Sequence, residues 1–74
     1  MHIQTIHLPE QGISYELHYY RPHQDYYAVI LDEFGETVKD ERGWDVATAN
    51  FETRAEACTA AEHRIKRMNK ERIR

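Results

Sequence analysis

The chain has 74 residues, of which 41% are hydrophobic and 31% are charged, and its aromatic side chains are five Tyr, two Phe and one Trp. A chain this short buries only about 60% of the surface that it exposes when unfolded, so residues 1–74 are expected to form a single domain with one small core. The aromatic content argues against a disordered chain, and the lack of an apolar run near 18 residues argues against a membrane span.

Cysteine usage indicates the compartment in which the protein folds. Cys58 is the only cysteine, so the chain cannot form the internal disulfide that small secreted domains normally need. The first twelve residues also lack the apolar run of a signal peptide. We therefore expect a cytoplasmic protein.

Charge is divided unequally along the chain, whose formal net charge is -3. Residues 1–52 contain three Lys or Arg against ten Asp or Glu, a net of -7, whereas residues 53–74 contain seven against three, a net of +4. The two parts could serve as separate binding surfaces, or they could meet between two copies in self-association.

The first two thirds of the chain are predicted to form strands. Residues 13–21 alternate apolar and polar side chains, which is typical of a strand with one wet face. Residues 25–32 follow after a short loop in which Pro22 favours a hairpin. We find no internal repeat. Further strands are expected at residues 2–8, 36–39 and 44–51.

The last third is predicted to form one helix over residues 53–71. Thr53 and Glu56 have the spacing of a capping box, in which each side chain bonds the backbone N–H of the other residue. The expected fold class is therefore α+β, an antiparallel β-meander of three to four strands with one C-terminal α-helix packed on one face. The apolar stripe of this helix consists of Ala57, Cys58, Ala61, Ile65 and Met68.

The acidic stretch at residues 32–45 is one candidate surface, since it carries six carboxylates against Lys39 and Arg42. Tyr20 and Tyr26 are expected to flank the hairpin loop as an exposed pair of cross-strand neighbours, and tyrosine is common at protein interfaces. Alternatively, the acids only keep the turns soluble and the tyrosines only pack across the sheet. The partner-binding candidates are Tyr20, Tyr26, Asp32, Glu33, Glu36, Asp40 and Glu41.

The other three tyrosines, Tyr15, Tyr19 and Tyr27, are expected to face the core. Trp44 is expected on one side of the last strand together with Val46.

The basic end of the helix is the second candidate surface. Its face away from the core could neutralise the phosphates of a nucleic acid through Lys66, Arg67, Lys70 and Arg74. The helix dipole explains the same charges, because it favours cations near the C-terminus by roughly 0.3–1 kcal/mol each. Glu62 and Lys66 also have the spacing of an i, i+4 ion pair.

No motif predicts catalysis, a cofactor or a metal site. The five histidines form no HxxxH pair on the predicted helix, and Cys58 has no base spaced to activate it. The three glycines stand singly at turns, unlike those of a phosphate-binding loop. Since a chain this short also offers little room for a concave active site, we do not expect an enzyme.

The stretch WDVATANFETRAEACTAAEHRIKRM at residues 44–68 contains the pattern F-x-T-R-x-E-A-x-x-A-A after a strand. It resembles the last strand and helix of the arm-type DNA-binding N-terminal domains of phage tyrosine recombinases, and it is similar to short ββα domains of unknown function. The resemblance implies a sheet followed by a helix. In the recombinase domains the sheet enters the major groove through basic or polar side chains, whereas the sheet region here has a net charge of -7.

These observations favour a small non-catalytic interaction module that binds another protein through an acidic, tyrosine-bearing sheet region. A phage or mobile-element inhibitor or regulator of a nucleic-acid-handling protein is one concrete form. The alternative is a nucleic-acid-binding accessory domain that uses the basic face of the helix.

Overall fold

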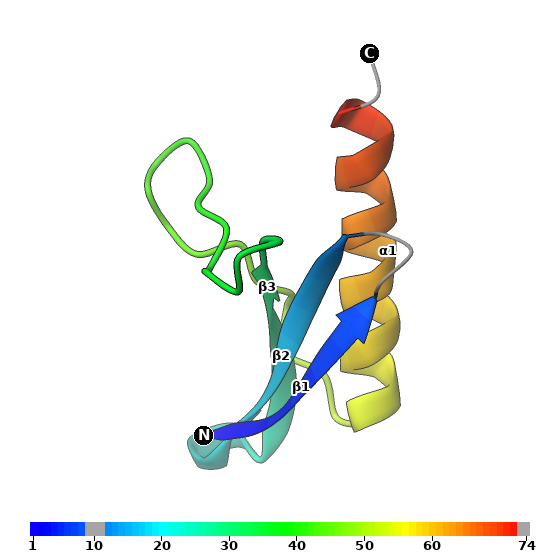
Figure 1. Ribbon diagram of the computed structural model, residues 1–74. Coiled ribbons are helices and arrows are strands. Elements are labelled where there is room, and N and C mark those ends of the chain that lie inside the picture. Colours follow the sequence, from blue (N-terminus) through cyan, green and yellow to red (C-terminus); the bar gives the residue numbers. More distant parts are fainter. Residues whose placement is uncertain (9–11, 73–74) are drawn as a thin grey trace.

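The computed structural model describes residues 1–8 and 12–72 as a three-stranded sheet followed by one helix. The strands β1 (His2–Leu8), β2 (Ile13–Tyr20) and β3 (Asp25–Leu31) are antiparallel and lie in the order β1-β2-β3. The helix α1 (Arg54–Arg72) packs on one face of β2 and β3 (Figure 1). The α+β meander with a C-terminal helix that the sequence predicts is therefore confirmed.

The strands predicted at residues 36–39 and 44–51 are not formed. These segments make only isolated β-bridges, in which Thr37, Lys39, Asp45, Ala47 and Phe51 take part. The backbone pairs Thr48 with Ala28 and Phe51 with Tyr26, so one extra residue interrupts the ladder, as in a β-bulge. The Ala28 N–H also bonds the Thr48 hydroxyl at 2.9 Å. Residues 46–51 therefore follow the edge of β3 without forming a regular strand.

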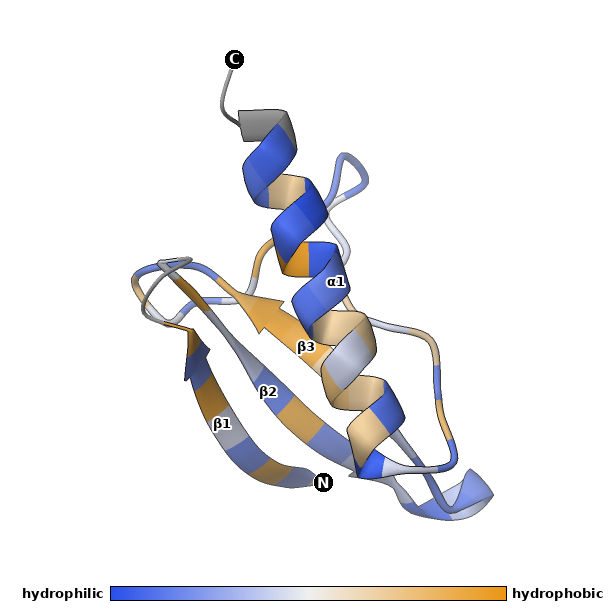
Figure 2. Cartoon of the chain, turned by 90° about the vertical axis from the view of Figure 1, so that its right-hand side faces the viewer, coloured by the Kyte–Doolittle hydropathy of each residue, from blue (hydrophilic) through white to orange (hydrophobic). Residues whose placement is uncertain are grey.

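The core lies between α1 and the sheet. The helix contributes Ala57, Ala61 and Ile65, which are fully buried, and Cys58 and Met68 are half-buried beside them. Figure 2 shows the apolar part of β3 behind α1, whose exposed side is largely hydrophilic. No helix in the described part of the chain is long and apolar enough to span a membrane. The sheet and residue 46 supply the other side chains of this core cluster, namely Ile13, Tyr15, Ala28, Ile30 and Val46, and Leu17, Val29 and Leu31 are also buried.

The start of α1 has the predicted cap in a modified form. The Thr53 hydroxyl accepts the Glu56 N–H at 3.2 Å, and it donates to Glu56 Oε1 at 2.9 Å. The glutamate therefore bonds the side chain of Thr53 and not its backbone N–H. The hydrogen bond from Glu56 N–H satisfies one of the amides that a helix start leaves unpaired.

Tyr15 faces the core as predicted, and Tyr19 lies on the same face of β2, but Tyr26 and Tyr27 lie on other faces than predicted, because the hairpin loop sets another register. Tyr20 pairs with Asp25, and Tyr19 pairs with Tyr26. Since successive side chains of a strand alternate between faces, Tyr20 and Tyr26 point to opposite sides and do not form a pair. Tyr27 pairs with His18 on the face away from α1, so the prediction that Tyr27 faces the core is wrong.

Tyr15 joins the middle strand to the helix. Only 1% of its surface is exposed, and its hydroxyl donates to Glu62 Oε2 at 3.0 Å. Burial, together with the neighbouring Cys58 thiol and Glu62 carboxyl, raises the pKa of Tyr15 well above its usual value, because all three disfavour the phenolate. Within the described residues, Glu62 forms no salt bridge with Lys66, so the expected i, i+4 pair is absent.

We expect Tyr15 to make the protein sensitive to alkaline pH. Its pKa is higher in the folded chain than in the unfolded chain, so the stability it adds is complete below about pH 10 and is lost as the pH rises further. Above about pH 10, the free energy of unfolding of the wild type should fall more steeply than that of Tyr15→Phe, by up to about 1.4 kcal/mol per pH unit. Urea denaturation followed by circular dichroism measures both slopes.

The control is Tyr20→Phe, which removes the hydroxyl of a tyrosine that is 41% exposed. This variant should keep the slope of the wild type. Equal slopes for the wild type and Tyr15→Phe would contradict the role of Tyr15.

Candidate functional site

Residues 32–45, which we call the acidic excursion, leave the sheet at the end of β3. Their outer loop projects on the side of the sheet away from α1 (Figure 1). The excursion rejoins the sheet at Val46, whose carbonyl accepts the Ile30 N–H at 2.9 Å. All five acidic candidates for partner binding lie on this segment: Asp32, Glu33, Glu36, Asp40 and Glu41.

The acidic excursion contains two turns that are built in the same way. In each turn, one carboxylate oxygen of an aspartate accepts the backbone N–H groups of the residues two and four positions later, at 2.8–3.0 Å. The glycine three positions after the aspartate has a φ near +80° and donates its N–H to the aspartate carbonyl. The two segments, DEFGE and DERGW, begin at Asp32 and Asp40 and are a short internal repeat that the sequence analysis missed.

The structure gives the five acids two different roles. Asp32 and Asp40 each use a carboxylate oxygen to hold a turn, as aspartate commonly does in Asx-turns. Glu33, Glu36 and Glu41 are exposed, and their side chains take no part in these turn bonds. The three glutamates are therefore the candidates that a partner can reach without opening a turn.

An ion pair closes the outer loop of the acidic excursion. Lys39 donates to Asp45 Oδ1, and the two residues also form a β-bridge. Hydrogen bonds from Lys39 and Thr37 lower the pKa of Asp45 below its usual value. Asp45 is thus neutralised within the loop, unlike the three exposed glutamates.

Two large apolar side chains on the acidic excursion are functional candidates that the sequence analysis missed. Phe34 is 80% exposed and Trp44 is 71% exposed. Trp44 does not lie on a strand face with Val46, because its N–H is bonded to Asp40 at the end of the second turn. The repeated Asp-Glu-x-Gly pattern was the available signal, since it assigns both aromatic residues to turns.

The two tyrosine candidates lie away from the acidic excursion. Tyr20 is at the hairpin end of β2, where its ring centroid is 5.1 Å from that of His23. Tyr26 is half-buried, with its ring 5.1 Å from that of Tyr19. The acidic excursion leaves the opposite end of β3, so the structure does not combine the tyrosines and the acids into one surface.

The sheet face opposite α1 carries a cluster of histidines. His18 stacks on Tyr27 with centroids 5.1 Å apart, and its Nε2 lies 3.3 Å from Glu16 Oε1. His2 meets His18 edge-on at 5.5 Å, and its Nε2 is 3.9 Å from Glu16 Oε2. The described residues contain no group of three or more His, Cys, Asp or Glu side chains placed to hold a metal ion. The rings therefore pack over a sheet face that no helix covers.

The basic candidates lie on the exposed side of α1. Lys66, Arg67 and Lys70 are exposed, and none of them forms a salt bridge with another described residue. Arg74 lies outside the described residues. The last turns of α1 extend beyond the sheet (Figures 1 and 2).

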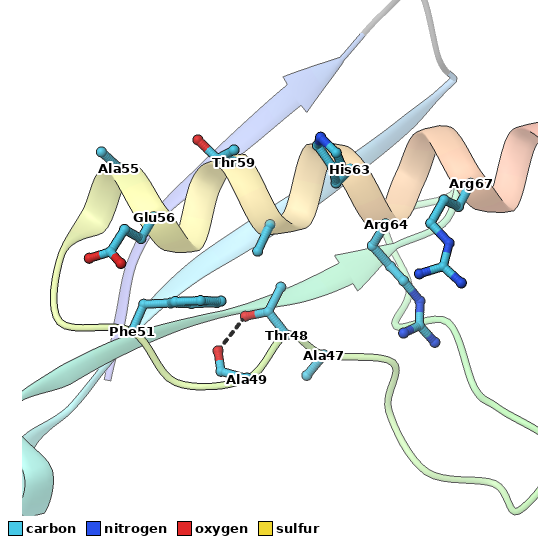
Figure 3. Close-up of a pocket in the computed structure, with 11 residues that line it drawn as sticks. Ala47, Thr48, Ala49, Phe51, Ala55, Glu56, Thr59, His63, Arg64 and Arg67 are labelled. Carbon is cyan, nitrogen blue, oxygen red and sulfur yellow. Dashed lines mark hydrogen bonds between the residues drawn. The ribbon is translucent and has the colours of Figure 1, made fainter.

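An open groove of about 660 Å³ runs between α1 and residues 47–51. Figure 3 shows Arg64 and Arg67 pointing to one end of the groove, with Phe51 and Glu56 at the other end. Alanine and threonine side chains form most of the lining between them. Arg67 therefore lines this groove, whereas Lys66 and Lys70 do not.

Comparison of the chain with protein-family models, with curated proteins and with solved structures finds no match. The resemblance of residues 44–68 to the recombinase domains therefore stays a prediction from the sequence.

We expect Asp40→Ala to loosen the second turn of the acidic excursion. The substitution removes two hydrogen bonds to backbone N–H groups, each worth roughly 0.5–1.5 kcal/mol. Hydrogen exchange at the Arg42 and Trp44 amides, measured by NMR, should therefore become about 2- to 10-fold faster.

The first turn provides an internal control, because the Phe34 and Glu36 amides are bonded to Asp32 and should exchange at an unchanged rate. Glu41→Ala is the matched variant, since it removes an exposed carboxylate without removing a turn bond. Equal exchange rates in Asp40→Ala and Glu41→Ala would show that the Asp40 carboxylate does not hold the turn.

Proposed function

We propose that the protein is a small non-catalytic module that binds another protein through the acidic excursion. The observation that supports this most directly is the exposure of Phe34 and Trp44, 80% and 71%, on turns whose backbone is held by aspartate side chains. A large aromatic side chain can bury about 150–250 Å² in a contact, and Trp is enriched among the residues that dominate binding energy. Because the turns are already formed, binding orders little additional backbone.

The partner that fits this surface has an apolar pocket for an aromatic ring and a surround of Lys or Arg. Glu33, Glu36 and Glu41 are exposed on the same segment as the two rings. Charges at the rim of an interface mainly speed association and select the partner, whereas buried aromatic anchors supply most of the affinity. We therefore assign affinity to Phe34 and Trp44 and electrostatic steering to the glutamates.

A basic surface is common on proteins that handle nucleic acids. An inhibitor or regulator of such a protein, encoded by a phage or mobile element, is the concrete form of the proposal. We place its action in the cytoplasm, because the single cysteine, Cys58, is half-buried against the core and the fold uses no disulfide.

The proposal predicts that Phe34→Ala/Trp44→Ala loses binding but keeps its fold. The immobilised wild type would capture partners from a lysate of the source organism, and calorimetry would then measure affinity for each purified partner. Truncating an anchor residue costs about 2 kcal/mol or more, so affinity should fall about 30-fold or more. The melting temperature should change little, since both side chains are mostly exposed.

The matched control is Tyr20→Ala, which truncates an exposed aromatic residue at the opposite end of the sheet. Its affinity for the partner should equal that of the wild type. An unchanged affinity in Phe34→Ala/Trp44→Ala, or a loss in Tyr20→Ala alone, would contradict the proposed site.

A second candidate function, nucleic-acid binding, is supported by the last turns of α1. Lys66, Arg67 and Lys70 are exposed, they form no salt bridge with other described residues, and these turns extend past the sheet (Figure 2). Cations in such a position can neutralise phosphates and release their counterions. In this arrangement the acidic sheet region faces away from the nucleic acid.

This second function predicts a steep dependence of binding on salt. If three phosphates are neutralised, a plot of the logarithm of the association constant for duplex DNA against the logarithm of the salt concentration should have a slope of about -2.7. Lys66→Glu/Arg67→Glu/Lys70→Glu should abolish binding, as measured by fluorescence anisotropy. Arg21→Glu/Arg42→Glu/Arg54→Glu has the same change in net charge and should bind almost as the wild type does. No binding by the wild type at about 50 mM salt would exclude this function.

A further inference from the structure

The sheet has one covered edge and one open edge. Residues 46–51 follow the outer edge of β3, where Val46, Thr48 and Phe51 exchange backbone hydrogen bonds with it. On the other side, no described residue forms a β-bridge with the outer edge of β1. Figure 2 shows β1 at the margin of the sheet. β1 thus presents backbone N–H and C=O groups that a further strand can bond.

The helix also leaves the apolar side of β1 incompletely covered. Ile6 pairs with Tyr15, and Leu8 pairs with Ile13, so both lie on the face of the sheet that carries the core. They remain half-buried, because α1 packs on β2 and β3 and β1 lies beside it (Figure 2). The open edge therefore has an apolar margin on the helix side.

β1 lacks the features that normally prevent an edge strand from pairing. Its sequence, HIQTIHL, contains no Lys, Arg, Asp, Glu or Pro. It is seven residues long, and the only irregularity in its pairing is the register shift between His2 and Gln4. Natural edge strands are usually shortened, charged, bulged or covered. The strand from Gln4 to Leu8 is instead regular, free of Lys, Arg, Asp and Glu, and open.

We propose that the outer edge of β1 pairs with β1 of a second copy, antiparallel about a two-fold axis perpendicular to the sheet. The pairing would produce one continuous six-stranded sheet with both helices on the same face. A second copy is the partner that these observations favour, because two uncharged strands meet without like-charge contacts although each chain has a net charge of -3.

The symmetry also decides which side chains meet. With both helices on one face, a residue of one copy can lie opposite only those residues of the other that point to the same side. Ile6 and Leu8 can therefore lie opposite only Gln4, Ile6 or Leu8 of the second copy, which extends the apolar margin across the contact on the helix side. Asp32 and Glu33 of the acidic excursion line a hollow beside His7 and Leu8. The pairing itself uses the backbone of β1, so the inference does not rest on the proposed function.

Sedimentation equilibrium tests the dimer. We expect the dimer to dissociate with a constant of about 1 μM. At a protein concentration of about 100 μM, the wild type should therefore sediment with twice the monomer mass of 8.8 kDa. Gln4→Lys/His7→Lys places charges on both faces of the strand at exposed positions, so the monomer should still fold. This variant should raise the dissociation constant at least about 10-fold.

The matched control is Gln24→Lys/His63→Lys, which makes the same two replacements at exposed positions away from β1 and should dimerise as the wild type does. Exchange of the β1 amides should slow as the wild-type concentration rises. A monomeric wild type at about 100 μM, or an edge variant that dimerises like the wild type, would overturn the proposal.

Ionic strength separates this dimer from an association of acidic and basic surfaces. A dimer held by strand pairing should persist when salt is raised from about 50 to 500 mM, because β1 carries no formal charge. Dissociation over this range would show that opposite charges hold the copies together, and it would also overturn the pairing of β1.

Discussion

The packing of the small-residue stripe of α1 on β2 and β3 is the contact on which the rest of the structure depends. Ala57 and Ala61 are fully buried, so the helix backbone can lie close to the sheet, and Ile65 fills the space further along. Burying one side chain of that size contributes about 1.5–3 kcal/mol, a large share of the stability of a domain this small. The hydrogen bond from Tyr15 to Glu62 fixes the position of the helix along β2.

This contact uses only one side of two strands, and that limit determines what remains available for binding. The edge of β1, the histidine-bearing face of the sheet and the acidic excursion all lie outside the area that α1 covers. The excursion gains its order only partly from the core, against which Val38 packs. Its two turns are held by Asp32 and Asp40, whose carboxylates accept the turn amides. Phe34 and Trp44 can therefore stay exposed on an ordered segment.

The sequence predicted those parts of the fold that depend on local patterns. Alternation in β2, helical spacing in α1 and the position of Thr53 are visible in single segments, and the structure has each of them. The faces of Tyr26 and Tyr27 were not predictable in this way, because they depend on which residues the hairpin loop pairs. A shift of one residue moves every side chain to the other face, and the observed pairing of Tyr20 with Asp25 makes that shift.

The errors in the candidate site have a similar origin. Alternation from Trp44 to Phe51 resembles a strand, but the bond of Trp44 to Asp40 and the extra residue before Phe51 prevent a regular ladder. The acidic candidates could be predicted, because the number and position of charged residues are read directly from the sequence. The exposure of Trp44 was not visible in the sequence, because alternation with Val46 two positions later predicts that Trp44 lies on a strand face.

The separation of charge along the chain is kept in the folded structure. Lys39 forms a salt bridge with Asp45, His2 and His18 lie beside Glu16, and no ion pair among the described residues links the acidic excursion to α1. The excursion projects from the sheet face opposite the helix, so Glu33 and Glu41 are not neutralised by Lys66 or Lys70 within one molecule. A net charge of -3 therefore conceals two surfaces of opposite sign. If the basic charges of α1 served only to neutralise the acidic excursion, the two would be expected to lie in contact. Because they are separate, distinct roles are favoured, and the acidic excursion is free to meet a basic partner.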